Sequence, residues 1–282
     1  MNMPAFSTIP ASAAETPETR HKIVIFEDVS VGFDKPVLDG ISFELLRGES
    51  KILLGVTGAG KSTILKLALG LIRPDQGRVF VLGHEVSRMR EQELFEVRRN
   101  IGMVFQESAL FDSLTVYDNV AYRLHEEHDI PEAEIEQRVR EALRFVELED
   151  TLDKMPPELS GGMRRRVAIA RAIVARPEVV LYDSPTGGLD PVTSTTIIEL
   201  IVKQRDVYRT SSLLVTHRLQ DAFIMATHYF DPQTNQMRQI EPGSRIRAHT
   251  SSLMLRDGKI VFDGPILEMA HSRDPYIHDY IS

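Results

Sequence analysis

The chain has 282 residues, of which 42% are apolar and 26% are charged, and its formal net charge is −8. This length and composition allow a sizeable core, and we expect one large domain or slightly more. The absence of cysteine excludes disulfides and thiolate metal sites and suits a reducing compartment. The acidic balance argues against nucleic acid as the main ligand, because a protein that binds phosphate backbones usually has a basic face.

Residues 1–21 are rich in Ala, Ser, Thr and Pro without sustained periodicity, and this pattern predicts a flexible tail. We expect one folded domain over residues 22–282. No stretch reaches the roughly 18 to 20 consecutive apolar residues that span a bilayer. The N-terminus also lacks a basic segment that leads into an apolar core. We therefore expect any membrane role to depend on a partner.

The periodicity of the remaining chain predicts an α/β core with a β-rich side piece. Alternating segments predict a partly antiparallel sheet at 22–29, 37–46 and 78–82. Apolar runs predict buried parallel strands, separated by helices, around Ile52 and at 101–105, 179–182 and 213–215. Helical patterns lie at about 115–125, 132–147 and 161–176. This is too much helix for a simple crossover, so we expect a small helical subdomain over about residues 107–176.

Residues 55–63 read Gly-Val-Thr-Gly-Ala-Gly-Lys-Ser-Thr, after an apolar run that predicts a buried strand. The three glycines permit a tight turn whose N–H groups point inward at a helix start and can cradle phosphate oxygens. Lys61 adds a charge for the β- and γ-phosphates, and the Ser62 hydroxyl is expected to bind magnesium. An ordinary glycine-rich turn is the alternative. The pattern predicts a site for ATP with Mg²⁺, formed by Gly55, Thr57, Gly58, Ala59, Gly60, Lys61, Ser62 and Thr63.

Five further motifs follow the phosphate loop in order. They are Gln106, Leu159-Ser-Gly-Gly-Met163, Asp183, Gly188-Leu-Asp190 and His217. With these motifs the chain resembles the nucleotide-binding subunit of ABC transporters over nearly all of residues 22–282. The stretch Val97–Val120, and Met163 where most members have Gln, are most similar to the Mla-type lipid transport ATPases that work with MCE proteins. The resemblance implies a P-loop NTPase core of the ABC ATPase type, with an antiparallel side sheet and a helical subdomain.

The resemblance implies catalytic roles for three residues at strand ends. Gln106 reaches from its strand to magnesium and the attacking water. His217 is the switch histidine that contacts the γ-phosphate and helps to hold the water. Asp183 ends an apolar strand, where an acid can hold magnesium directly or through water. The alternatives are a surface amide for Gln106, an ordinary strand-end histidine for His217, and a turn cap before Pro185 for Asp183.

Two more motifs are expected at a dimer interface. Ser160, Gly161 and Gly162 begin a helix whose hydroxyl and N–H groups contact a γ-phosphate, which in this family belongs to the opposite subunit. Asp190 resembles the loop that crosses the interface. Helix capping is the alternative for both motifs, and Asp190 can serve both purposes. Phe33 falls where the family has an aromatic residue that stacks on adenine, and a core phenylalanine is its alternative.

Ser184 departs from the family pattern, which places a Glu after the Asp to polarise the attacking water. A hydroxyl stays protonated near pH 7 and lacks the basicity of a carboxylate. Loss of a positioned general base costs roughly 10² to 10⁴ in rate, although phosphoryl transfer depends largely on positioning and electrostatics. Three hypotheses stay open: a slow site that relies on His217, an acid such as Glu107 that substitutes, or an ATP-binding clamp with little turnover. A substitution that traps the bound state is a further explanation.

We therefore expect an ATPase subunit that dimerises head to tail around two ATP molecules and drives an integral-membrane ABC permease. The expected cargo is phospholipid or another hydrophobic substrate, with an MCE-type lipid-binding protein as a partner. The expected location is peripheral, at the cytoplasmic face of the inner (plasma) membrane. The alternatives are a non-hydrolysing ATP-binding regulatory subunit, which Ser184 favours, and a soluble ABC protein of translation, DNA repair or cofactor assembly. Homodimer and heterodimer both stay open.

Three other segments bear on partners. Ser108–Tyr122 is apolar and aromatic, and by resemblance it lines the groove that receives a coupling helix of the permease; core packing is the alternative. Residues 231–250 form a polar insertion that we expect to be a surface hairpin or loop, with a regulatory contact as the alternative. Arg164–Arg166 resemble a basic patch, but a solvated helix face with salt bridges is the favoured interpretation.

Overall fold

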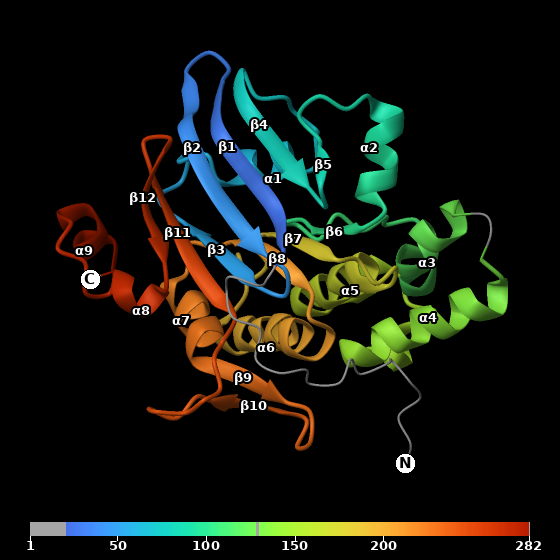
Figure 1. Ribbon diagram of the computed structural model, residues 1–282. Coiled ribbons are helices and arrows are strands. Elements are labelled where there is room, and N and C mark those ends of the chain that lie inside the picture. The colour runs from blue at the N-terminus through green and yellow to red at the C-terminus, as the bar shows by residue number, and fades with distance from the viewer. Residues whose placement is uncertain (1–20, 128–129, 282) are drawn as a thin grey trace.

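The computed structural model describes residues 21–127 and 130–281, so the predicted tail lies almost wholly outside the described residues. Its centre is a six-stranded sheet in the order β12-β11-β3-β8-β7-β6 (Figure 1). In that order, the strands are Lys259–Gly264, Thr250–Arg256, Ser50–Leu54, Ser211–Val215, Val179–Asp183 and Ile101–Val104. All but β12 run parallel. Because layers cover both faces, β3 and β8 are buried at every residue, which explains the apolar residues at 52–54 and 213–215.

An antiparallel side sheet lies against one face of this core and has the order β2-β1-β4-β5 (Figure 1). Its strands are Pro36–Leu46, Lys22–Gly32, Gln76–Val81 and His84–Glu85. Alternate residues of β2 point inward, because successive side chains of a strand face opposite sides. Helix α1 (Lys61–Ala68) shares their apolar core, to which it contributes Ile64 and Leu65. The predicted antiparallel side sheet is confirmed.

A group of helices packs against the other face of the core. Helices α3 (Val116–Glu126), α4 (Glu132–Phe145) and α5 (Gly161–Ile173) share an apolar cluster. These bounds agree with the predicted helical patterns to within three residues. Figure 1 shows α3 and α4 at one end of the molecule and the C-terminal helices at the other. The division of the chain into a core and a helical subdomain remains a prediction.

The other helices complete the layers around the central sheet. They are α2 (Glu91–Arg98), α6 (Pro191–Tyr208), α7 (Leu219–Thr227), α8 (Ile266–Met269) and α9 (Pro275–Ile281), with short 3₁₀ turns at Glu149–Thr151 and Pro156–Glu158. In the part of the chain that the structure describes, no helix has the length and apolar character needed to cross a membrane.

The polar segment expected at 231–250 contains an antiparallel hairpin, β9 (His228–Asp231) with β10 (Gln236–Gln239). The hairpin begins three residues before the predicted insertion. A buried arginine of α6 anchors its start: Arg205 is 2% exposed and donates to the His228 carbonyl at 2.9 Å. The hairpin is thus attached to the core at its base.

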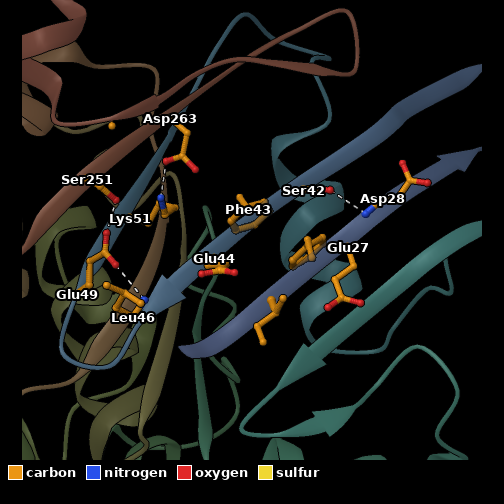
Figure 2. Close-up of a pocket in the computed structure, with 13 residues that line it drawn as sticks. Glu27, Asp28, Ser42, Phe43, Glu44, Leu46, Glu49, Lys51, Ser251 and Asp263 are labelled. Carbon is orange, nitrogen blue, oxygen red and sulfur yellow. Dashed lines mark hydrogen bonds and ion pairs between the residues drawn. The ribbon is translucent and has the colours of Figure 1, made fainter. Parts of the chain in front are cut away.

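Figure 2 shows a pocket of about 770 Å³ between the side sheet and the β11–β12 edge of the central sheet. Its most buried charge is Lys51, which is 4% exposed and donates to Asp263 Oδ1 at 2.5 Å. Glu49, which lies on the same side of the pocket as Lys51 in Figure 2, accepts the Leu46 N–H at 2.9 Å. None of the predicted nucleotide-binding residues lines this pocket.

Candidate functional site

The phosphate loop connects the end of β3 to the start of α1, and its glycines have the backbone angles that the sequence predicts. Gly55, Gly58 and Gly60 have φ of +135°, +84° and +98°. A Cβ at Gly55 would lie 2.5 Å from the Leu255 carbonyl oxygen, and one at Gly60 would lie 2.6 Å from Leu38 Cδ2. The turn therefore needs glycine for its backbone angles and for close packing.

Lys61 lies in the mouth of this loop and is 4% exposed. Its Nζ donates to the carbonyl oxygens of Gly55 and Val56, both at 2.8 Å. Burial lowers the pKa of the Lys61 ammonium, and the Asp183 carboxylate opposes this shift. An ammonium has three N–H groups, and these two bonds use two of them. Lys61 is therefore placed to offer a further donor to an anion bound in the loop.

Ser62 and Asp183 come together although 121 positions separate them, with Ser62 Oγ donating to Asp183 Oδ1 at 3.2 Å. Ser62 is in the first turn of α1, and Asp183 is the last residue of β7. Both side chains present hard oxygen donors, which suit Mg²⁺ when it is held by one or two protein groups and by substrate phosphates. The residues present therefore fit magnesium, and their role as its ligands remains a prediction.

His217 follows β8 at the same edge of the sheet. Although much of the residue is exposed, its ring loses water where it lies against the loop. This desolvation lowers the pKa of His217 and the Lys61 ammonium lowers it further, while Asp183 and a hydrogen bond with the Gly55 backbone oppose the shift. The imidazole is therefore neutral near pH 7, beside the two charged groups expected to hold phosphate and metal.

Ser184 and Gln106 both lie close to Gly187. A Cβ at Gly187 would be 3.5 Å from Ser184 Cβ and 3.8 Å from Gln106 Cγ. Ser184 is 6% exposed with φ +49°, and its N–H donates to the Val215 carbonyl at 2.9 Å. The structure thus brings together the position of the missing glutamate and the predicted water-binding amide.

Ser160 of the signature motif and Asp190 both cap helices, which is the alternative that the sequence offered for each. Ser160 Oγ accepts the Met163 N–H at 3.2 Å at the start of α5. Asp190 Oδ1 accepts the Thr193 N–H at 3.0 Å at the start of α6, and its bonds to Thr193 lower the pKa of Asp190. A Cβ at Gly162 would lie 2.4 Å from Thr193 Cγ2, so the two helix starts touch. Their roles toward a second subunit remain predictions.

The two predicted aromatic features are both exposed. Phe33 is 68% exposed, so the alternative that it packs in the core is wrong, and stacking on adenine remains a prediction. In Ser108–Tyr122, Phe111 and Tyr122 are 44% and 43% exposed, with ring centroids 4.9 Å apart. Val116, in contrast, is fully buried. This segment therefore combines core packing with an exposed aromatic pair.

The prediction of a solvated face with salt bridges at Arg164–Arg166 is wrong. Each guanidinium donates to a backbone carbonyl, and Arg165 is 5% exposed. The sequence contains one signal for this burial, which is the spacing of Arg165 from the apolar residues that follow it in α5. Arg165, Ala168, Ile169 and Ala172 are buried at spacings of i, i+3, i+4 and i+7, which is the periodicity of an inward helix face.

The comparisons with known proteins define the class of this chain. The ABC transporter family matches residues 38–187, which is more than half of the chain. The chain is 38% identical over 256 residues to protein TRIGALACTOSYLDIACYLGLYCEROL 3, chloroplastic, of Arabidopsis thaliana, covering 88% of this chain and 69% of that protein. The chain belongs to the ABC transporter family, as one of its ATP-binding subunits.

Other relatives differ in what their names say they transport. The intermembrane phospholipid transport system ATP-binding protein MlaF of Haemophilus influenzae is 36% identical over 197 residues, which cover 70% of this chain and 75% of that protein. The methionine import ATP-binding protein MetN of Carboxydothermus hydrogenoformans is 42% identical over 183 residues, which cover 65% of this chain and 54% of that protein. Relatives with similar sequence identity to this chain thus have names that give different transported substrates.

Among solved structures, the fold is similar to the dimeric ATP-binding cassette MJ0796 in a post-hydrolysis state with ADP and Pi. The TM-score is 0.70 at 26% identity, covering 86% of this chain and 99% of that chain. The predicted ABC ATPase fold is thereby confirmed.

Proposed function

We propose that this subunit binds ATP with magnesium, hydrolyses it, and drives phospholipid transport through an integral-membrane ABC permease. The observation that carries the nucleotide chemistry is the meeting of Ser62 Oγ and Asp183 Oδ1 at 3.2 Å beside the buried Lys61. The phospholipid part is supported by the name of the MlaF relative and by the Mla-like stretch Val97–Val120, and the name of the Arabidopsis relative contains that of another lipid. An MCE-type lipid-binding partner belongs to the same proposal.

The described residues suggest a division of labour. The N–H groups of the loop and the Lys61 ammonium bind phosphate oxygens, while Ser62 and Asp183 hold magnesium. Magnesium, when bound, would neutralise charge on the phosphates. Gln106 orients the attacking water near Ser184. Catalysis at such a site consists mainly of positioning and electrostatic stabilisation, so it does not require a carboxylate at position 184.

His217 is the better candidate to replace the missing general base. Its ring interacts electrostatically with both Lys61 and Asp183, and its lowered pKa keeps it neutral and able to accept a proton. The Glu107 carboxylate instead interacts electrostatically with Arg165 and raises the pKa of its guanidinium against the effect of burial. The second candidate function is an ATP-binding clamp with little turnover, which the hydroxyl of Ser184 favours.

A head-to-tail dimer is part of the proposal. Within one chain, the signature Ser160–Gly162 contacts the start of α6 through Gly162. This contact is not with the phosphate loop of the same chain. A second copy, or a related subunit, would bring its own signature to the γ-phosphate. We place this dimer peripherally at the cytoplasmic face of the inner membrane, with residues 22–282 as its ATPase domain and about 107–176 as the helical subdomain. A dimeric relative solved with ADP and Pi supports the arrangement.

Reconstitution with the permease tests the cargo. The complex in vesicles should transfer a fluorescent phospholipid to acceptor vesicles when ATP and Mg²⁺ are added, and the Lys61→Ala complex should not. Radiolabelled methionine serves as the comparison substrate. ATP-dependent uptake of methionine without phospholipid transfer would contradict the lipid assignment and leave the ATPase assignment in place.

A further inference from the structure

Arg165 is a buried cation that bridges three segments of the site. Its Nη1 donates to the carbonyl oxygen of Phe105 at 2.9 Å and to that of Ser184 at 3.4 Å. Its Nη2 donates to the Gly187 carbonyl at 3.4 Å. Phe105 immediately precedes Gln106, and Gly187 lies close to both Gln106 and Ser184. One guanidinium on the signature helix α5 therefore holds the backbone next to both Gln106 and Ser184.

Two of these carbonyls also close tight turns. The Phe105 carbonyl accepts the N–H of Ser108 at 3.0 Å, and the Ser184 carbonyl accepts the N–H of Gly187 at 2.9 Å. A guanidinium presents five N–H donors in a planar, rigid fork, whereas an ammonium is a compact point charge on a flexible stem. The fork can therefore fix the positions of the two turns relative to each other.

Burial makes the environment of Arg165 unfavourable for a cation. Burial lowers the pKa of its guanidinium, and the Glu107 carboxylate opposes this shift. Its Nε is buried and makes no hydrogen bond within the described part of the chain. Buried charges are tolerated when they are hydrogen-bonded or paired, so the carbonyl bonds offset the cost of placing Arg165 here.

A second arginine of α5 holds the same turn. Arg171 donates to the carbonyl oxygens of Ala109 at 2.8 Å and Ser108 at 2.9 Å. Ser108 and Ala109 have φ of +66° and +48°, a left-handed conformation that is uncommon for residues other than glycine. The turn after Gln106 is thus attached to α5 at several points, and Arg165 extends the attachment to Ser184.

We propose that Arg165 is a positioning residue for ATP hydrolysis, which holds Gln106 and Ser184 at a fixed separation and joins both to the helix that begins after Ser160. A movement of α5 then moves both turns together, so that the water site assembles as one unit. This inference rests on the proposed ATPase function. It concerns the backbone of the site and assigns Arg165 no contact with ATP.

Amide hydrogen exchange tests the link without depending on turnover. Arg165→Met keeps an unbranched apolar chain and removes every donor. In the nucleotide-free protein, exchange of the Ser108 and Gly187 amides should accelerate together, by about tenfold or more. Arg166→Met is the matched control, because Arg166 donates to the Val146 carbonyl at 3.0 Å, in another segment. Wild-type exchange at both amides in folded Arg165→Met, or acceleration at one alone, would overturn the link.

Turnover then separates positioning from support of the fold. Arg165→Met should lower kcat about tenfold to a hundredfold, because small displacements of catalytic groups have effects of this size. Its Kd for ATP should stay within about twofold, and its Tm near that of Arg166→Met. Arg165→Lys, which keeps the charge without the fork, should give an intermediate kcat. Parallel losses of Tm, ATP affinity and kcat would instead assign Arg165 to the fold.

Failure of the ATPase proposal is distinguishable from failure of this inference. Wild-type turnover no higher than that of Lys61→Ala would contradict the ATPase proposal, and the hydrogen exchange of Ser108 and Gly187 would still decide the role of Arg165 in joining the two turns.

Discussion

Two glycines of the phosphate loop allow the stability cost of a methyl group to be separated from its effect on binding. At Gly58, a Cβ would meet nothing within 4 Å, and φ is +84°. Gly58→Ala should therefore cost only the conformational penalty, about 1–2 kcal/mol. At Gly55, φ is +135° and a Cβ would lie 2.5 Å from the Leu255 carbonyl oxygen. Gly55→Ala adds displacement of the β11 backbone to the strain, so we expect about 3 kcal/mol or more.

Thermal unfolding measures this difference. For a chain of this size, 1 kcal/mol shifts Tm by about 2–4 °C. Gly58→Ala should thus lower Tm by about 2–8 °C, and Gly55→Ala by at least about 6 °C. In Gly58→Ala the methyl points into open space at the loop, where the phosphates are expected. ATP affinity should therefore fall about tenfold or more although the protein stays folded.

The reasoning fails if Gly58→Ala destabilises the protein as much as Gly55→Ala. It also fails if Gly58→Ala keeps wild-type affinity for ATP, because the open space beside Gly58 would then lie outside the phosphate site. Titration of both variants with ATP and Mg²⁺ by calorimetry, at a temperature well below either Tm, distinguishes these outcomes.

Three further predictions concern the metal, the histidine and the exposed aromatic residue. Asp183→Asn keeps an acceptor for Ser62 but loses the charge, so the Mg²⁺ concentration for half-maximal ATP binding should rise about tenfold or more; an unchanged requirement would remove Asp183 from the metal site. The pKa of His217 lies below its ordinary 6.5, so its neutral form, and with it kcat/KM, should be lost only as the pH falls through that lower value. An acid limb at or above pH 6.5, or one that persists in His217→Ala, would contradict this role. Phe33 is 68% exposed, so Phe33→Ala should leave Tm unchanged and weaken ATP binding by about 1–3 kcal/mol, and equal affinity would exclude stacking.

Much of the fold was predictable because local physics dominates its central elements. Strands buried on both faces, such as Val179–Asp183, are continuous apolar runs in the sequence. The spacing of the glycines in the phosphate loop likewise predicts the positive φ angles of its turn. The amphipathic pattern of α4 (Glu132–Phe145) similarly identified a helix with one buried face. These features depend on residues that are close together in the sequence, so they can be predicted from it.

The relations between segments were harder to predict. The approach of Gln106 to Ser184 depends on β6 pairing with β7, a choice of strand order that neither strand specifies alone. Arg165 looked like one of three exposed arginines, because its backbone acceptors lie 19 to 60 positions away and form no pattern in the sequence. The absence of a carboxylate at position 184 was visible from the sequence, and measurement of ATP turnover determines its effect on the rate.

Steady-state ATP turnover of the purified permease complex tests the central claim most directly. Wild type should exceed the Lys61→Ala blank clearly, because in the proposed mechanism Lys61, Asp183, Gln106 and His217 supply the positioning. Ser184→Glu should raise the rate further, by up to roughly 10² to 10⁴. Wild-type turnover equal to the blank, with activity restored in Ser184→Glu, would contradict intrinsic hydrolysis and identify the chain as an ATP-binding clamp.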